Sequence, residues 1–314
     1  MSVRGSILPA PEQKAADDRS EIELKGFSGA RIVLIREDEA PPFVRKISGS
    51  VSGNARLKTQ AIKQKLTGSL LDAIAATPRI LDEGDLDGLY FFDMDYVKGL
   101  DGISFLRTAE FDDVRAFADG LCASLGRFAA LEDDRQALVP RDVMLSKCRE
   151  ILASLPVDEM RGREIMERLV ALVSAANLPE ELTQTACHGD LTLENIVVTE
   201  DGRIYFIDLL DTFFPHWLAD VAKLDQDLEG GWYTRKSAAL PPGIIHYLRD
   251  RLIGFSEAQL PGAQPIIALI LCVHFARILP YTRTEADRQF VLDRLDVLIA
   301  RACDEFQSTT GSAQ

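Results

Sequence analysis

The sequence predicts an α+β, bilobal protein with a small antiparallel β-rich N-lobe and a larger, mainly helical C-lobe. Short stretches rich in β-branched residues, separated by Gly and Pro turns, run from Glu21 to about Tyr96. After Gly99, apolar residues recur at three- and four-residue intervals for most of the remaining length. The expected parts are a flexible tail at 1–19, the N-lobe at 20–96, the C-lobe at 97–306 and a second flexible tail at 307–314.

Five strands and one helix are expected in the N-lobe. The first three strands are EIELKGF, ARIVLIRED and PFVRKIS, and two more, TPRILDEG and GLYFFDMDYV, flank an Asp/Gly turn. The helix is NARLKTQAIKQKL, in which Leu57, Ala61, Ile62 and Leu66 have helical spacing. We therefore expect these four side chains to form its buried face.

The C-lobe is expected to be helical apart from one β-hairpin. The hairpin consists of NIVV and RIYFID around the turn TEDG. The longest apolar run, Pro265 to Phe275, is shorter than the roughly 20 residues that span a bilayer, so we expect a buried helix. A ligand is expected in a cleft between lobes of unequal size. The expected helices are 111–131, 141–155, 160–176, 243–255, 265–279 and 285–306.

The amino-acid composition limits the possible binding partners and the cellular compartment of the protein. The 314 residues carry a net charge of −14, which argues against unaided binding to nucleic acid or to an anionic membrane. The five cysteines are scattered and show no CxxC spacing, which favours reduced thiols in a cytoplasmic protein. The N-terminal stretch lacks the apolar core of a signal peptide.

One stretch, HGDLTLENIVVTEDGRIYFIDLLD from His188 to Asp211, concentrates ionisable groups beside strand-like runs. His188, Asp190 and Asn195 form H-x-D-x-x-x-x-N, and Asp208 follows Asn195 by 13 residues. Phosphoryl transfer needs a carboxylate at the acceptor hydroxyl and hard oxygen ligands for Mg²⁺. Asp190 would orient the hydroxyl, while Asn195 and Asp208 would bind metal. Taken singly, His188 could be a core histidine, and Asp190 with Asn195 could be turn and cap residues.

HGDLTLENI followed by FIDLLD resembles the catalytic loop and metal-binding segment of the aminoglycoside phosphotransferase/choline kinase family, a small-molecule branch of the protein-kinase-like fold. The resemblance implies that Asp190 is catalytic and that His188 braces the loop. LADVAKL resembles the family's Asp-Leu-Ala segment, which gives Asp220 a structural role; a helix N-cap is the alternative. Gly189 stands where protein kinases carry Arg, and no A-P-E segment follows Asp208, so a small-molecule acceptor is favoured.

The same resemblance assigns nucleotide-binding residues in the N-lobe. Lys46 would grip the α- and β-phosphates, although a register shift of one residue would put Arg45 in its place. The following helix contains no Glu to hold that lysine, so Gln60 or Gln64 substitutes or the pairing is absent. The remaining candidates are Gly26, Ser28 and Gly29 in a loop over the phosphates or a plain turn, and Met94, Asp95 and Val97 at the hinge beside the adenine.

The sequence thus predicts an ATP- and Mg²⁺-dependent phosphotransferase acting on a hydroxyl of a small molecule such as a sugar, amino sugar or amino alcohol. The alternative is a catalytically silent kinase-like module that binds nucleotide and regulates a partner. The missing Glu favours the alternative, whereas the complete set of Asp190, Asn195 and Asp208 argues against it. Two groups have open roles: Trp217, Trp232 and Tyr233 in an acceptor pocket or the core, and Asp225, Asp227 and Glu229 in amine recognition or on a solvated helix face.

Overall fold

The computed structural model describes residues 19–24, 29–37, 40–71 and 73–311, and these divide into two compact units. The first unit contains residues up to Leu57 together with Leu81–Tyr96. The second contains Lys58–Ile80 and the chain from Val97 onward. The tail expected at 1–19 lies outside the described residues except for Arg19, which begins the first strand.

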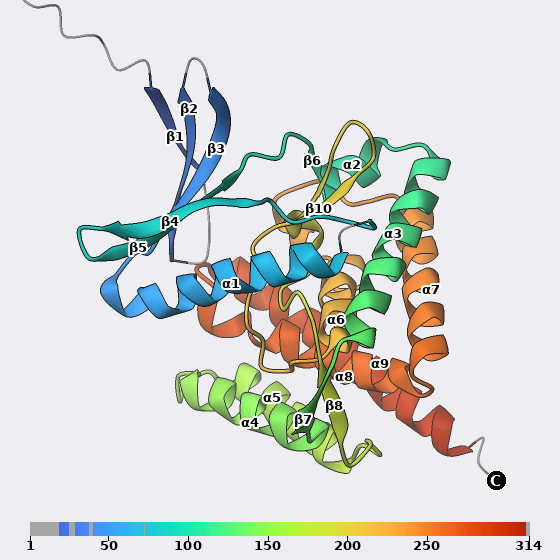
Figure 1. Cartoon of the computed structure of the whole chain (residues 1–314). Helices are drawn as coiled ribbons and strands as arrows, with labels where there is room; N and C mark the ends of the chain where they lie inside the picture. The colour runs from blue at the N-terminus through green and yellow to red at the C-terminus, as the bar shows by residue number, and fades with distance from the viewer. Residues whose placement is uncertain (1–18, 25–28, 38–39, 72, 312–314) are drawn as a thin grey trace, which may run out of the picture. The chain divides into compact units, whose positions relative to one another are not determined.

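The first unit is built on a five-stranded sheet in the order β1-β2-β3-β5-β4 (Figure 1). The pairs β1–β2, β2–β3 and β3–β5 are antiparallel. Asp87 and Gly88, with φ of 53° and 83°, lie between β4 and β5, where a tight hairpin turn requires left-handed backbone. The strands are β1 (Arg19–Leu24), β2 (Arg31–Glu37), β3 (Ala40–Ile47), β4 (Ile80–Leu86) and β5 (Leu89–Asp95).

Helix α1 (Asn54–Leu71) buries a different face from the one expected. Leu57 and Ala61 are buried, but Ile62 and Leu66 are 50% and 67% exposed. The buried stripe continues instead through Gln60, Gln64 and Thr67 to Leu71, at intervals of three and four residues. The spacing of apolar residues indicated the wrong face of α1, because two positions on the buried face are glutamines.

The segment from Lys58 to Ile80 belongs to the second unit, although we expected it in the N-lobe. Leu71 and Ala75 lie in the hydrophobic core of that unit. The backbone of Ala76 also pairs with the catalytic hairpin, donating to the carbonyl of Ile204 at 2.9 Å and accepting from Phe206 at 2.8 Å. These contacts explain the assignment.

The second unit is mainly helical, and α8 lies at its centre (Figure 1). Helices α4, α5, α6, α7 and α9 pack against α8. Among the described residues, Ala263–Tyr281 is apolar and long enough to cross a membrane, but 67% of it is buried, as expected of a core helix. The helices are α2 (Gly102–Thr108), α3 (Phe111–Ala130), α4 (Pro140–Ser154), α5 (Met160–Ala175), α6 (Trp217–Leu228), α7 (Pro242–Gln259), α8 (Ala263–Ala276) and α9 (Glu285–Gly311), with short 3₁₀ turns η2 (Leu193–Asn195), η3 (Trp232–Arg235) and η4 (Leu279–Tyr281). A further 3₁₀ turn, η1 (Val51–Gly53), precedes α1 in the first unit.

Strands in the second unit include the expected hairpin, β9 (Ile196–Val198) with β10 (Ile204–Phe206). The expectation of a single β intrusion is wrong. β6 (Leu100–Asp101) extends the hairpin sheet, and β7 (Glu132–Leu138) pairs with β8 (Leu182–Thr185). Strand β7 reads EDDRQAL, a charged run that lacks the alternation of apolar and polar residues by which a strand is predicted.

The C-terminal tail expected at 307–314 is also partly wrong. Helix α9 continues through this polar segment to Gly311. The sequence QSTTG contains no proline, and its first strong helix breaker is the terminal glycine. Polarity alone therefore did not mark the end of the helix.

Candidate active site

His188 braces the catalytic loop from inside the second unit. Its Nδ1 accepts a hydrogen bond from the amide of Asp190 at 3.2 Å, so the ring proton resides on Nε2, which lies 3.0 Å from the carbonyl oxygen of Ile207. Burial lowers the pKa of His188 to about 4, so the ring is neutral near pH 7. His188 thus acts as a neutral bracket between the catalytic loop and the strand that precedes Asp208.

Asp220 holds the backbone at the start of the same loop. Its two carboxylate oxygens accept from the amides of His188 and Gly189 at 2.5 and 2.8 Å. Burial raises the pKa of Asp220 to about 6, and these two hydrogen bonds oppose the shift. The structural role expected for Asp220 is therefore observed. The N-cap alternative is wrong, because His216 caps α6 and its Nδ1 accepts from the amide of Leu218.

Gly189 allows the catalytic loop to cross the segment that follows Asp208. Its φ is +90°, and a Cβ there would lie 1.9 Å from the carbonyl oxygen of Leu210. The crossing is closed by a 3.0 Å hydrogen bond from the amide of Leu210 to the carbonyl of His188. Lys63 of α1 also donates to the Leu210 carbonyl, at 2.5 Å. Only glycine meets both the backbone and the steric requirement here.

Asp190 is partly exposed and remains ionised. Burial alone would raise the pKa of Asp190, but opposing contributions, of which Lys223 is the largest, hold it below its ordinary value. The ammonium nitrogen of Lys223 lies 3.0 Å from Oδ1. Asn195 Nδ2 donates to the Asp190 carbonyl at 2.8 Å and lies 3.3 Å from Oδ2. An anionic carboxylate is thus held in a fixed orientation with about a quarter of its side chain, 27%, in contact with solvent.

The structure brings Asn195 and Asp208 onto adjoining segments, as a metal site requires. The amide of Ile207 donates to the Asn195 carbonyl at 3.0 Å. Because Asn195 Nδ2 is used within the loop, its amide oxygen remains as a hard ligand. Asp208 has a φ of +60°, a strained conformation for a residue with a Cβ, and such strain is concentrated at functional sites.

The ligands available at this site suit Mg²⁺ better than a metal ion that takes all of its ligands from protein side chains. Within the described part of the chain, no group of three or more His, Cys, Asp or Glu side chains could hold a metal. Mg²⁺ commonly takes one or two side-chain oxygens and completes its shell with phosphate and water. Asn195 and Asp208 would supply such a pair.

In the first unit, Lys46 and Arg45 face opposite ways. Arg45 makes a bidentate ion pair with Asp93 on β5, with both contacts at 2.6 Å. Lys46 lies on the buried face of β3 with Val44 and is only 3% exposed. Lys46, and not Arg45, is therefore the residue whose side chain lies on the buried face of the strand. Its phosphate role stays a prediction.

The other nucleotide candidates are placed only in part. Gly26 and Ser28 lie outside the described residues, and Gly29 has a φ of +74°. Met94 is buried in β5, Asp95 ends that strand, and Val97 belongs to the second unit. Their contacts with adenine stay predictions.

One of the two glutamines expected to replace the missing Glu has another partner. Gln64 Nε2 donates to the carbonyl of Pro78 at 2.7 Å, and the Thr77 hydroxyl donates to the Gln64 carbonyl at 3.0 Å. These bonds tie α1 to the segment that leads into β4. Gln64 is thus engaged in holding the second unit together.

The acidic residues of α6 are buried, so their assignment to a solvated helix face is wrong. Asp227 Oδ2 accepts from the amide of Leu193 at 2.8 Å and so anchors the catalytic loop. Asp225 pairs with Arg249, with its closest contact at 2.5 Å, and Glu229 pairs with Arg249 and Arg301 at 2.6 and 2.8 Å. Of the aromatic candidates, Trp217 and Tyr233 are core residues and Trp232 packs against the core.

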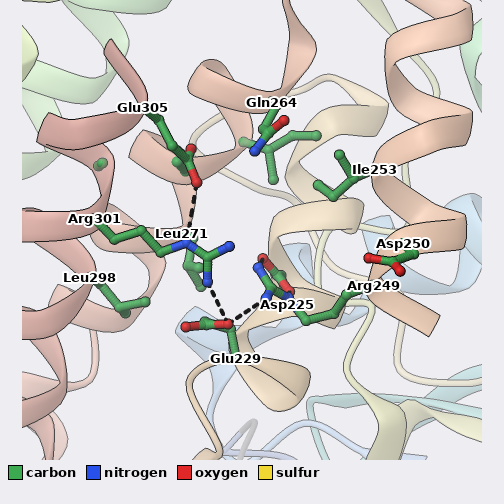
Figure 2. Close-up of a pocket in the computed structure, with 13 residues that line it drawn as sticks. Asp225, Glu229, Arg249, Asp250, Ile253, Gln264, Leu271, Leu298, Arg301 and Glu305 are labelled. Atoms are coloured by element: carbon green, nitrogen blue, oxygen red, sulfur yellow. Dashed lines mark hydrogen bonds and ion pairs between the residues drawn. The ribbon is translucent and has the colours of Figure 1, made fainter. Parts of the chain in front are cut away.

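Arg249 and Arg301 line a cavity of about 320 Å³ formed by α6, α7, α8 and α9 (Figure 2). None of the catalytic-loop residues lines this cavity. Figure 2 shows the ion pairs that join Glu305, Arg301 and Glu229 across its wall. The acidic groups Asp225, Glu229 and Glu305 of this cavity are therefore already paired with Arg249 and Arg301.

Comparison with known proteins identifies the class to which this site belongs. Residues 26–252 match the phosphotransferase enzyme family, and the chain belongs to that family. The resemblance of the catalytic stretch to aminoglycoside phosphotransferases is thereby confirmed. No curated protein sequence matches the chain significantly.

Solved structures show the same protein-kinase-like fold at low identity. The GDP complex of aminoglycoside 2′-phosphotransferase-IIIa has a TM-score of 0.62 and 15% identity, covering 90% of this chain and 93% of that chain. Macrolide 2′-phosphotransferase from Brachybacterium faecium has a TM-score of 0.56 and 14% identity, with coverage of 90% and 93%. A fructosamine-3-kinase homologue from Thermobifida fusca has a TM-score of 0.53 and 16% identity, with the same coverage of 90% and 93%. The bilobal α+β fold expected from the sequence is confirmed.

Proposed function

We propose that this protein transfers the terminal phosphoryl group of ATP, in a Mg²⁺-dependent reaction, to a hydroxyl group of a small molecule. The observation that supports this most directly is the state of Asp190. It is an ionised carboxylate on a loop fixed by three buried side chains, His188, Asp220 and Asp227. Family membership and the nucleotide complexes of similar structures support the same reaction.

Each site residue has one task in this reaction. Asp190 accepts the hydrogen bond of the acceptor hydroxyl and takes its proton as the bond to phosphorus forms. Asn195 and Asp208 would hold Mg²⁺, which neutralises charge on the phosphate oxygens. Lys46 would bind the non-transferred phosphates. Positioning and charge neutralisation account for most of the catalysis, because the protein forms no covalent bond.

Other expectations enter the proposal unchanged. We expect a cytoplasmic protein that requires neither nucleic acid nor a membrane, with sugars, amino sugars and amino alcohols as the first acceptors to test. A catalytically silent nucleotide-binding module is the competing function. The strain at Asp208 and the ionised Asp190 favour the enzyme, because a silent module would not need to retain either feature.

The first experiment removes the charge of Asp190 without changing its size. With labelled ATP, Mg²⁺ and pooled hydroxyl metabolites, the wild-type protein should form a new phosphoester. Asp190→Asn should lower kcat by about 100-fold or more and leave nucleotide binding intact. Asp158→Asn, an exposed loop carboxylate, is the matched control. Wild-type turnover in Asp190→Asn would show that Asp190 is not the catalytic base.

The second experiment tests the metal role of Asp208 separately. Calorimetric titration of ATP with and without Mg²⁺ should show that Mg²⁺ strengthens binding to the wild type. Asp208→Ala should lose this strengthening, because the carboxylate that bridges protein and metal is gone. An unchanged Mg²⁺ effect in that variant would exclude Asp208 as a ligand.

A further inference from the structure

Two cations lie near the catalytic carboxylate, and they belong to separate helices. Lys223 on α6 contacts Asp190 at 3.0 Å, and its ammonium group is also 3.1 Å from Gln226 Oε1. Arg277 follows the last turn of α8 and interacts electrostatically with Asp190, lowering its pKa, although burial acts first to raise it. Asp190 thus contacts one of these cations, Lys223, and interacts electrostatically with the other, Arg277.

Arg277 is held in place without an ion pair. Its guanidinium lies over the ring of Phe213, 5.4 Å from the centroid, and Nη1 is 3.4 Å from His274 Nδ1. Among the residues that the structure describes, no Asp or Glu forms an ion pair with Arg277. Other partly buried arginines of this unit do have carboxylate partners: Arg235, Arg249 and Arg288.

The two side chains that contact Arg277, Phe213 and His274, carry no charge. Burial, followed by the charges of Lys223 and Arg277, lowers the pKa of His274 well below its ordinary value, so the ring is neutral. Phe213 offers only a π face, which orients a guanidinium while leaving its N–H groups available. Burial also lowers the pKa of Arg277, which means that desolvation of this charge is only partly compensated. An anionic partner would therefore stabilise the charge of the Arg277 guanidinium.

The acidic residues that could instead have attracted a cationic acceptor are engaged elsewhere. Asp225 and Glu229, on the same helix as Lys223, are paired with Arg249 and Arg301 (Figure 2). Asp227 accepts from the amide of Leu193. These three carboxyl groups of α6 and its C-terminus are therefore engaged, whereas Arg277 has no carboxylate ion pair among the described residues.

We propose that Arg277 binds an anionic group, a carboxylate or a phosphate, on the acceptor molecule, with Lys223 adding to the positive potential. The acceptor would then be an acidic hydroxyl compound rather than an amino sugar or amino alcohol. The inference rests on the proposed phosphotransferase function and narrows its acceptor. The planar guanidinium suits bidentate recognition of either group, so both belong to one ligand chemistry.

Matched acceptor classes test the proposal through turnover. We expect phosphoryl transfer from labelled ATP to hydroxy acids and sugar acids, or to sugar phosphates, and little to neutral polyols or amino alcohols. Arg277→Gln should lower kcat/KM for the acidic acceptor by about 10- to 100-fold, the worth of a charge-assisted hydrogen bond. Arg168→Gln, which removes an exposed ion pair with Asp296, should leave kcat/KM unchanged. Preference between sugar acids and sugar phosphates identifies the anionic group.

A second readout does not need the correct acceptor. The Nε–H resonance of Arg277, assigned by its loss in Arg277→Gln, should shift when acetate or inorganic phosphate is added to the wild-type protein. An unshifted resonance overturns the inference. Transfer to neutral or amine acceptors at a rate that Arg277→Gln leaves unaltered also overturns it, but the phosphotransferase function then stands. Transfer to none of these acceptor classes contradicts the proposed function itself, and the resonance then decides whether Arg277 is an anion site.

Discussion

The ammonium group of Lys223 lies 3.0 Å from a carboxylate oxygen of Asp190. Lys223 lies in the middle of α6 and Asp190 lies in the catalytic loop, and their side chains are 12% and 27% exposed, respectively. Lys223 thereby helps to keep ionised the residue that we propose as the proton acceptor. This contact has a direct consequence for pH dependence.

Lys223→Met should move the acid limb of the kcat/KM profile to higher pH. The ion pair holds the pKa of Asp190 below its ordinary value against the effect of burial, so its removal lets burial raise that pKa. A higher pH is then needed to ionise Asp190. Lys223→Arg should restore most of the profile, and Lys58→Met, on the exposed side of α1, should not move it. A Lys223→Met profile with the wild-type acid limb would show that Asp190 is not controlled by this contact.

Asp220→Asn should slow catalysis more than it weakens nucleotide binding. An asparagine offers one acceptor oxygen, so one of the two amides held by Asp220 would lose its partner and face an NH₂ group. We expect kcat to fall by about 10-fold or more, the cost of one charge-assisted hydrogen bond. Hydrogen exchange should accelerate at the amides of His188 and Gly189 but not in α8. Unaltered exchange at both amides would contradict the bracing role.

The catalytic stretch could be predicted from the sequence because its geometry is local. His188, Asp190, Asn195 and Asp208 lie on one loop and one hairpin, so their spacing along the chain largely determines their spacing in space. Strand alternation likewise predicts that Lys46 and Arg45 lie on opposite faces of the sheet, and Asp93 on the neighbouring strand pairs with Arg45.

The partners of that stretch could not be predicted in this way. Lys223 contacts Asp190 and Arg277 interacts with it electrostatically, and both lie far from Asp190 along the chain. No local pattern marks a lysine or arginine that will act on a given carboxylate. Asp227 looked like part of a solvated face because charge suggests exposure, yet its partner is a backbone amide that only the folded loop provides. Tertiary contacts decide such cases.

Asp227→Asn should make stability less sensitive to pH. Burial raises the pKa of Asp227 to about 7, whereas an unfolded chain gives about 3.9. The folded state therefore binds this proton more tightly, so the free energy of unfolding falls as pH rises through that window. Asparagine keeps an oxygen for the amide of Leu193 and has no charge to bury.

Urea unfolding at about pH 5 and about pH 8 measures this effect. The wild type should lose more stability between the two pH values than Asp227→Asn. The exposed Asp158→Asn should behave like the wild type. Equal losses in wild type and Asp227→Asn would mean that Asp227 does not take up a proton in this range.

Gly189→Ala should be far more disruptive than a glycine replacement with the same backbone conformation elsewhere. Gly189 and Gly202 both have positive φ, +90° and +80°. A Cβ at Gly189 would lie 1.9 Å from the Leu210 carbonyl oxygen, whereas a Cβ at Gly202 would meet no neighbouring atom within 4 Å. Gly202→Ala should cost about 1–2 kcal/mol of stability and leave kcat unchanged, since only left-handed strain is introduced. Gly189→Ala should introduce the same backbone strain and in addition displace the loop. We expect kcat to fall by about 10-fold or more, because a shift of about 1 Å misplaces the proposed base. Equal kcat values for the two variants would show that the crossing of the two segments does not position Asp190.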